Sequence, residues 1–97
     1  MREAQWIADA TVCGVMYLID WYPAIILTKN SESKVFGEIY TIDEKTLAEL
    51  DEYEGQEYRR VSVLAEDVHG EKHQTWIWEA REVPDRPVIL SGDWLQR

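Results

Sequence analysis

The stretch LDEYEGQEYRR, residues 50–60, marks the point where one kind of secondary structure gives way to another. Leu47, Leu50 and Glu54 follow the three-to-four spacing of residues on one face of a helix. Gly55 suits the position just after a helix, because glycine adopts a positive φ without a steric penalty. The segment beyond it alternates apolar and polar residues, as a half-buried strand does. The spacing therefore predicts a helix that ends at this glycine.

Short strands are predicted on both sides of the helix, because runs of β-branched and aromatic residues there are bounded by turn residues. The predicted elements are a helix over 43–55, strands over 12–19, 24–29, 34–42, 58–68 and 73–80, and a candidate last strand over 87–90. Gly37, inside its strand, predicts the close approach of another backbone. Gly70 supplies a positive φ for a hairpin turn over residues 69–72. Together these elements predict an α+β fold. Its form is expected to be a small mixed β-barrel or a strongly curved sheet, with about six strands and one main helix.

The start of the helix has two candidate caps. Thr41 and Glu44 have the spacing of a capping box, in which each side chain bonds a backbone N–H near the other. Alternatively, Asp43 caps the helix while Ile42 packs against Leu47 across its first turn. The sequence leaves both arrangements open.

Composition limits the number of domains and the class of partner. A chain of 97 residues with 45% hydrophobic residues is expected to form one globular domain over residues 1–97. No apolar run reaches the roughly 18 residues of a membrane span, and the N-terminus has no signal-peptide pattern, so a cytoplasmic protein is expected. The net charge of −9 argues against nucleic-acid and anionic-membrane partners, which are bound by basic clusters. A small molecule or another protein remains as the partner class.

Metal, thiol and phosphate chemistry have little support in this sequence. Cys13 lies in an apolar stretch and is expected to be a buried small hydrophobic residue. His69 and His73 flank the predicted turn, where their spacing does not aim two imidazoles at one point. There is no glycine-rich phosphate loop, so we expect neither a metal site nor a cofactor. Proton transfer by a carboxylate remains.

Glu54 is the carboxylate that the pattern selects. Helix ends prefer cations in the last turn, because the macrodipole is negative there. Glu54 is therefore either a solvated surface residue or an acid placed where its charge is disfavoured. Burial and the negative helix end would both raise its pKa, and a carboxyl that titrates nearer neutrality can take and return a proton.

Five short motifs resemble one known family. In chain order they are YLIDWYPAIIL (17–27), KVFGEIYTI (34–42), LAELDEYEG (47–55), EYRR (57–60) and SGDW (91–94). Together they resemble the gamma-glutamyl cyclotransferase-like family, in particular its gamma-glutamylamine cyclotransferase-type branch. The resemblance runs from about Gly14 to Trp94. Each motif alone is weak, but five in order with sensible gaps are fairly specific.

This resemblance implies a small β-barrel and an enzyme that releases 5-oxoproline from gamma-glutamyl amines or peptides. The catalytic acid of the family is the glutamate of its E-G pair, which corresponds here to Glu54. It would take a proton from the substrate α-amine and give it to the leaving amine. Because the attack is intramolecular, the protein needs mainly to hold the reactive conformation and to move protons.

The resemblance also marks candidate substrate-binding residues. They are Tyr17, Tyr22, Pro23, Gly37, Glu38, Tyr58 and Arg60. Arg60 could have a different role, because it could form an ion pair with Asp51 or Glu54 or simply balance the charge of the nearby acids. Glu38 could instead hold a hydrogen bond behind the substrate or lie on the surface. Trp94 is expected to plug the core at the end of the barrel.

One family motif has no counterpart in this sequence. Family members begin with a strand that ends in a Y-G-[ST]-L loop, and residues 1–10 correspond to the segment after that loop. We therefore expect an N-terminally short domain that lacks this strand and loop. The alternative function is then a non-catalytic domain that binds a small ligand or a protein. A sheet with unpaired edges also predicts a homodimer, in which strands or residues 1–10 cover the gap.

Overall fold

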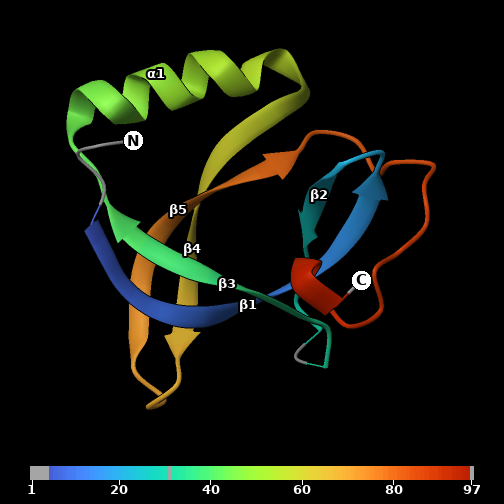
Figure 1. Ribbon diagram of the computed structural model, residues 1–97, viewed down its shortest axis with the longest axis horizontal. Helices are drawn as coiled ribbons and strands as arrows, with labels where there is room; N and C mark the ends of the chain where they lie inside the picture. Colours follow the sequence, from blue (N-terminus) through green and yellow to red (C-terminus); the bar gives the residue numbers. More distant parts are fainter. Residues whose placement is uncertain (1–4, 31, 97) are drawn as a thin grey trace.

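The computed structural model describes residues 5–30 and 32–96 and has an α+β architecture (Figure 1). Its elements are β1 (Gln5–Ile19), β2 (Tyr22–Leu27), β3 (Lys34–Thr41), α1 (Glu44–Glu54), β4 (Tyr58–Asp67) and β5 (Lys72–Ala80), with 3₁₀ turns η1 (Gly55–Glu57) and η2 (Trp94–Gln96). The helix lies across one end of the curved sheet, as Figure 1 shows. No helix in the described part of the chain is long and apolar enough to cross a membrane.

β1 is the strand to which three others pair. Its residues 14–19 pair with β2, and its residues 5–13 pair with β3. Only Ala10 and Thr11 pair with β4, which forms a hairpin with β5. Every one of these pairings is antiparallel, whereas a mixed β-barrel was one of the two expected forms. Since the ladder between β1 and β4 is so short, the two halves of the sheet can curve strongly toward each other.

The sheet stays open between β2 and β5, so it is a strongly curved sheet and not a closed barrel. In place of a ladder, the side chain of Glu79 on β5 crosses to β2. Its Oε2 accepts the backbone N–H of Leu27 at 2.8 Å, and its Oε1 accepts Nη2 of Arg59 at 3.0 Å. Glu79 is the one buried charged residue of the described chain, and both of its oxygens have partners. A buried carboxylate needs such partners, because desolvation of an unpaired charge is costly.

The predicted strand over 12–19 begins earlier, at Gln5. Ala10, Val12, Gly14 and Met16 are buried in alternation, so the period of two extends back past the predicted start. Pairing with β3 supplies hydrogen bonds to this extension, in which Ala8, Asp9 and Ala10 have low strand propensity of their own. The part of the expected N-terminal segment at residues 1–4 lies outside the described residues.

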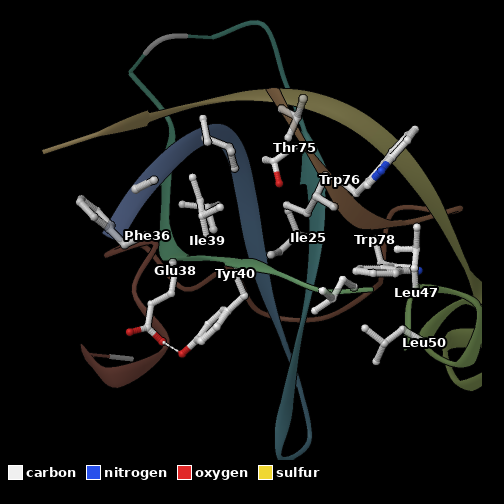
Figure 2. Close-up of a pocket in the computed structure, with 18 residues that line it drawn as sticks. Ile25, Phe36, Glu38, Ile39, Tyr40, Leu47, Leu50, Thr75, Trp76 and Trp78 are labelled. Carbon is white, nitrogen blue, oxygen red and sulfur yellow. Dashed lines mark hydrogen bonds between the residues drawn. The ribbon is translucent and has the colours of Figure 1, made fainter. Parts of the chain in front are cut away.

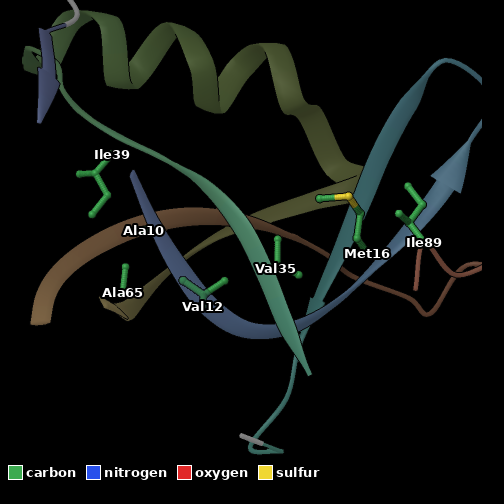
Figure 3. Close-up of a cluster of buried hydrophobic side chains, with 7 residues drawn as sticks. All are labelled: Ala10, Val12, Met16, Val35, Ile39, Ala65 and Ile89. Carbon is green, nitrogen blue, oxygen red and sulfur yellow. The ribbon is translucent and has the colours of Figure 1, made fainter. Parts of the chain in front are cut away.

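The core is small and built on one face of the sheet (Figure 3). It contains mostly short apolar side chains: Ala10, Val12, Met16, Val35, Ile39, Ala65 and Ile89. Trp94 packs against this cluster, as expected of a residue that plugs the core. Cys13 is only half-buried, and its Sγ lies 3.7 Å from Nζ of Lys34, so it is not the buried residue that had been expected.

Asp43 caps the start of the helix, which decides between the two candidate caps. The carboxylate of Asp43 accepts the backbone N–H of Thr46 at 2.7 Å. At the other end, Gly55 has φ +66°, and its N–H donates to the carbonyl of Asp51. The predicted glycine stop is therefore confirmed, and the helix covers residues 44–54.

The β4–β5 hairpin also matches the prediction closely. Gly70 has φ +81°, as the turn requires. The carboxylate of Asp67 accepts the backbone N–H groups of His69 and Glu71 at 2.9 and 3.0 Å, which fixes the turn. These local hydrogen bonds are typical of an aspartate at the start of a turn.

Two strand expectations need correction. The candidate strand over 87–90 is reduced to a single bridge between Val88 and Tyr17, flanked by hydrogen bonds to β1. Gly37 does not mark a close backbone approach, because nothing lies within 4 Å of where its Cβ would be. The close approach occurs instead at Gly92, where a Cβ would meet the carbonyl oxygen of Lys34.

Candidate active site

Glu54 is the last residue of α1, and its carboxyl is half-buried beside the sheet. Burial raises the pKa of this carboxyl above its ordinary value. The position follows from the sequence: Leu50 and Leu47 lie one and two turns before Glu54 on the same helix face, and Gly55 stops the helix directly after the acid. The chain therefore holds a carboxyl with increased proton affinity at a fixed point.

Tyr58 lies four residues after Glu54, at the start of β4, and the two groups interact. Burial raises the pKa of the Tyr58 phenol, and the nearby Tyr22, Glu54 and Glu57 raise it further. Tyr22 comes from the first residue of β2, so the fold brings two distant tyrosines together near the helix end. Tyr22, Glu57 and Tyr58 line an open surface cavity of about 610 Å³ just past the helix end, and Glu54 itself is not among its lining residues. Three predicted residues, Glu54, Tyr22 and Tyr58, are thus neighbours.

A second and more apolar cavity of about 350 Å³ lies between α1, β3 and β5 (Figure 2). Figure 2 shows Trp78 beside Leu47 and Leu50 at one end of this cavity, with Glu38 at the other. Neither Glu54 nor the two tyrosines of the first cavity line it. The two cavities are therefore separate, and the helix contributes to the boundary of the second.

Gly37 and Glu38 belong to this second cavity and not to the surroundings of Glu54. Oε1 of Glu38 accepts the hydroxyl of Tyr40 at 3.0 Å, and this bond is the first cause of a raised pKa at Tyr40. Glu38 is exposed, so its position fits a surface or rim residue.

Arg60 is engaged with the helix. Its Nε lies 3.2 Å from Oδ1 of Asp51, and its guanidinium carbon lies 4.5 Å from the ring centroid of Trp76. Nε1 of Trp78 donates to the same Oδ1 of Asp51 at 3.0 Å. Of the alternatives left open for Arg60, the ion pair with Asp51 is the one formed.

Sequence reasoning missed the two tryptophans of this cluster. The alternation of Trp76 and Trp78 along β5 put both on one face, and this was the available signal. The sequence does not predict the register of the β4–β5 ladder, which places Arg60 opposite Trp78. Without the register, neither indole could be assigned to a partner on the helix.

Tyr17 and Pro23 lie elsewhere in the sheet. Tyr17 pairs with Ala24 on one side and forms the bridge to Val88 on the other, and Pro23 pairs with Leu18. Neither residue lines the cavity beside Glu54 or the apolar cavity. The predicted set of site residues is therefore spread over several places, and only part of it gathers at the helix end.

The histidines behave differently from each other. His69 is exposed, whereas His73 places Nε2 at 2.8 Å from Oδ2 of Asp67. Asp67, Glu71 and His73 offer ligand-type atoms within 4.8 Å of one another. Asp67 is already engaged in the hairpin turn, and its bond to His73 is the first cause of its lowered pKa. These contacts account for the cluster as a hydrogen-bonded turn.

Comparison with known proteins identifies the family. The family described as gamma-glutamyl cyclotransferase, AIG2-like, matches residues 1–96. The gamma-glutamylcyclotransferase family protein YtfP of Escherichia coli K12 is 35% identical over 101 aligned residues, covering 100% of this chain and 82% of that protein. An uncharacterized protein of Pyrococcus horikoshii has the same fold, with a TM-score of 0.71 and 25% identity, covering 94% of this chain and 71% of that one. YkqA of Bacillus subtilis matches with a TM-score of 0.77 and 25% identity, over 95% of this chain and 32% of that one. The chain belongs to the gamma-glutamyl cyclotransferase, AIG2-like, family.

Proposed function

We propose that this protein releases 5-oxoproline from gamma-glutamyl amines or peptides, with Glu54 as the general acid and base. The observation that carries the proposal is the half-buried Glu54 carboxyl at the end of α1, whose pKa is raised by burial. Family membership supplies the reaction class. A carboxyl with a pKa nearer the working pH is better matched to accept a proton and then return it.

The proposed reaction needs no cofactor to balance. Glu54 takes a proton from the substrate α-ammonium group, and the free amine attacks the γ-carbonyl carbon of the same molecule. The new carbon–nitrogen bond closes a five-membered lactam, and the bond to the leaving amine breaks. Glu54 then returns its proton to that amine. The attacking nitrogen still carries one proton more than a lactam N–H, and this proton passes through water to the released amine, which leaves as an ammonium ion. Because both reacting groups belong to one molecule, holding the folded substrate supplies much of the rate.

Tyr22 and Tyr58 are the proposed substrate contacts nearest to Glu54. Both line the open cavity beside the helix end, and their hydroxyls can donate or accept hydrogen bonds there. Gly37 and Glu38 would contact only a substrate that reached the apolar cavity. Arg60 is proposed to act on the helix, through its ion pair with Asp51, and not on the substrate.

The apolar cavity favours an alternative function, which is binding of a small ligand without catalysis. Its volume of about 350 Å³ lies within the range of small-molecule sites, and most of its lining is aliphatic or aromatic. The ligand would be an apolar small molecule, held between the helix and β5. A protein partner is also compatible with this alternative.

An assay for 5-oxoproline release separates the two functions. The purified chain is incubated with a panel of gamma-glutamyl amines and dipeptides, and 5-oxoproline is quantified. Release above the uncatalysed rate from at least one compound supports the enzyme. No release from any compound, combined with saturable binding of an apolar probe that quenches tryptophan fluorescence, supports the binding domain.

We also propose that the protein is a homodimer. Large apolar side chains are exposed on β1, β3 and β5, among them Trp6 at 56%, Phe36 at 49% and Trp76 at 51%. Exposed apolar surface next to a free sheet edge is typical of a contact between chains. Two-fold symmetry is the simplest arrangement.

A further inference from the structure

One carboxylate oxygen of Asp51 receives two donors from the sheet. Nε1 of Trp78 donates to Oδ1 at 3.0 Å, and Nε of Arg60 lies 3.2 Å from the same atom. The two donors come from neighbouring positions on β4 and β5, since Arg60 and Trp78 are opposite each other in the ladder. The guanidinium carbon of Arg60 in turn lies over the Trp76 ring, 4.5 Å from its centroid. The aspartate is therefore held from two strands at once.

Asp51 lies one turn before the end of the helix. Its backbone carbonyl accepts the N–H of Gly55, the residue that stops α1. Its side chain is bound to Trp78 and Arg60 on the sheet. Asp51 therefore connects the last helical turn both to Gly55 and to the sheet. Glu54 lies within this last turn, three residues after Asp51 and directly before Gly55.

The rest of the helix is weakly held. None of the 11 residues of α1 is fully buried. Leu47 and Leu50, its apolar residues on the sheet side, line the apolar cavity and do not fill it. Helices in proteins gain most of their stability from packing an apolar face, and this face is loosely packed. The polar contact at Asp51 is therefore the specific attachment of the C-terminal turn.

We propose that Trp78 and Arg60, acting through Asp51, are positioning residues that fix the last turn of α1 and with it the carboxyl of Glu54. The inference rests on the proposed role of Glu54, but its geometry is independent of turnover. In this proposal Arg60 is a positioning residue and not a substrate contact, because its guanidinium is bound to Asp51 and lies over Trp76.

The consequence for chemistry is direct. A carboxyl that must take a proton from one nitrogen and return it to another has to stay within hydrogen-bond reach of both. If the last turn of α1 frays, Glu54 becomes more hydrated, and the burial that raises its pKa is lost. Loss of the anchor should therefore lower both the proton affinity of Glu54 and the order of the helix end.

Trp78→Phe is the sharpest test, because it removes the indole N–H without changing any charge. The carboxyl carbon of Glu54 is followed by NMR as the pH is varied, and exchange of the Gly55 amide is measured on the same samples. We expect the midpoint for Glu54 to fall toward that of an exposed glutamate, and Gly55 exchange to become roughly tenfold faster. Both changes should appear while the protein remains folded by circular dichroism.

Trp6→Phe is the matched control. The Trp6 indole also donates to an aspartate, Asp9 at 3.4 Å, but in β1 and away from the end of α1. It should leave the Glu54 midpoint and the Gly55 exchange rate unchanged. If Trp78→Phe prevents folding, Arg60→Lys keeps the positive charge and removes the stacked guanidinium, and it should give the same two changes in smaller measure.

Unchanged Glu54 titration and unchanged Gly55 exchange in a folded Trp78→Phe protein would overturn the inference. So would equal changes in Trp78→Phe and Trp6→Phe, because these would reflect a general loosening. If wild type releases no 5-oxoproline while Trp78→Phe still shifts both readouts, the proposed function fails and the positioning role stands.

Discussion

At the scale of single residues, the proposal depends on one proton. The pKa of Glu54 is raised in the folded protein, so the folded state holds this proton more tightly than the unfolded chain does. Stability then falls as the pH rises from the unfolded pKa through the folded one, and the loss persists above it. At neutral pH the Glu54 carboxylate therefore destabilises the folded state slightly, as expected of the proposed role in proton transfer.

Replacement of Glu54 by glutamine should remove that cost. We expect Glu54→Gln to be as stable as wild type at pH 7, or more stable by less than about 1 kcal/mol, since a half-exposed carboxylate is partly solvated. The difference should shrink as the pH falls through the folded pKa and be absent by about pH 3, where Glu54 is protonated in both states. Urea unfolding at both pH values measures it, and a Glu54→Gln protein less stable than wild type at pH 7 would argue against a disfavoured charge.

At the scale of secondary-structure elements, the end of α1 depends on the conformation of Gly55. Its φ of +66° is strained for any residue with a side chain, although no atom lies within 4 Å of where a Cβ would be. We expect Gly55→Ala to lower the free energy of unfolding by about 1–2 kcal/mol. Gly37→Ala is the control, because it also meets no atom but needs no positive φ. It should be neutral or stabilising by roughly 0.5–1 kcal/mol; equal losses at both positions would contradict this account of the helix stop.

The link between β5 and β2 is a second test at this scale. Glu79→Ala leaves the backbone N–H of Leu27 without its partner, and we expect a loss of about 1–3 kcal/mol in urea unfolding. Glu79→Gln retains an acceptor and carries no charge, so it should lose less. Arg59→Ala should also lower stability, because it leaves Oε1 of the buried carboxylate without its partner. A Glu79→Ala protein as stable as wild type would mean that the crossing side chain does not hold the open sheet together.

Local signals accounted for much of this fold, and non-local pairing explains what they could not. The cap at Asp43, the stop at Gly55 and the turn at Gly70 are each determined by residues a few positions apart. The start of β1 could not be predicted, because residues 5–11 become a strand through pairing with β3. The same limit applies to the site. The spacing put Glu54 on the helix face that continues Leu47 and Leu50, and the family resemblance gave it the catalytic role. Only the sheet brings Tyr22 to Tyr58 and places Glu38 at a different cavity.

At the scale of the whole molecule, the outer edge of β3 is the surface expected to pair with another chain. The Phe36 N–H on this edge donates to Gly92, and backbone groups of Glu38 and Tyr40 face the same side because the pattern repeats every two residues. Within the described chain, these two have no backbone partner on that edge. Such an edge invites the addition of a further strand.

We expect sedimentation velocity to show a homodimer at tens of micromolar protein in 0.15 M salt. Tyr40→Lys places a charge on the edge, which disfavours strand addition, and should shift the protein toward monomer. Leu64→Lys is the control, because Leu64 is 61% exposed on β4, which is paired with β5 along its length. A wild-type protein that remains a single monomeric species at high concentration would contradict the dimer.

The most direct test of the central claim compares two neighbouring glutamates. Glu54→Gln keeps the shape of the side chain but cannot shuttle a proton, so 5-oxoproline release should fall by roughly two to four orders of magnitude. Glu52→Gln removes the same charge from an exposed position two residues away and should leave release nearly intact. Equal losses at the two positions would indicate a diffuse effect of charge, and full activity in Glu54→Gln would contradict the account.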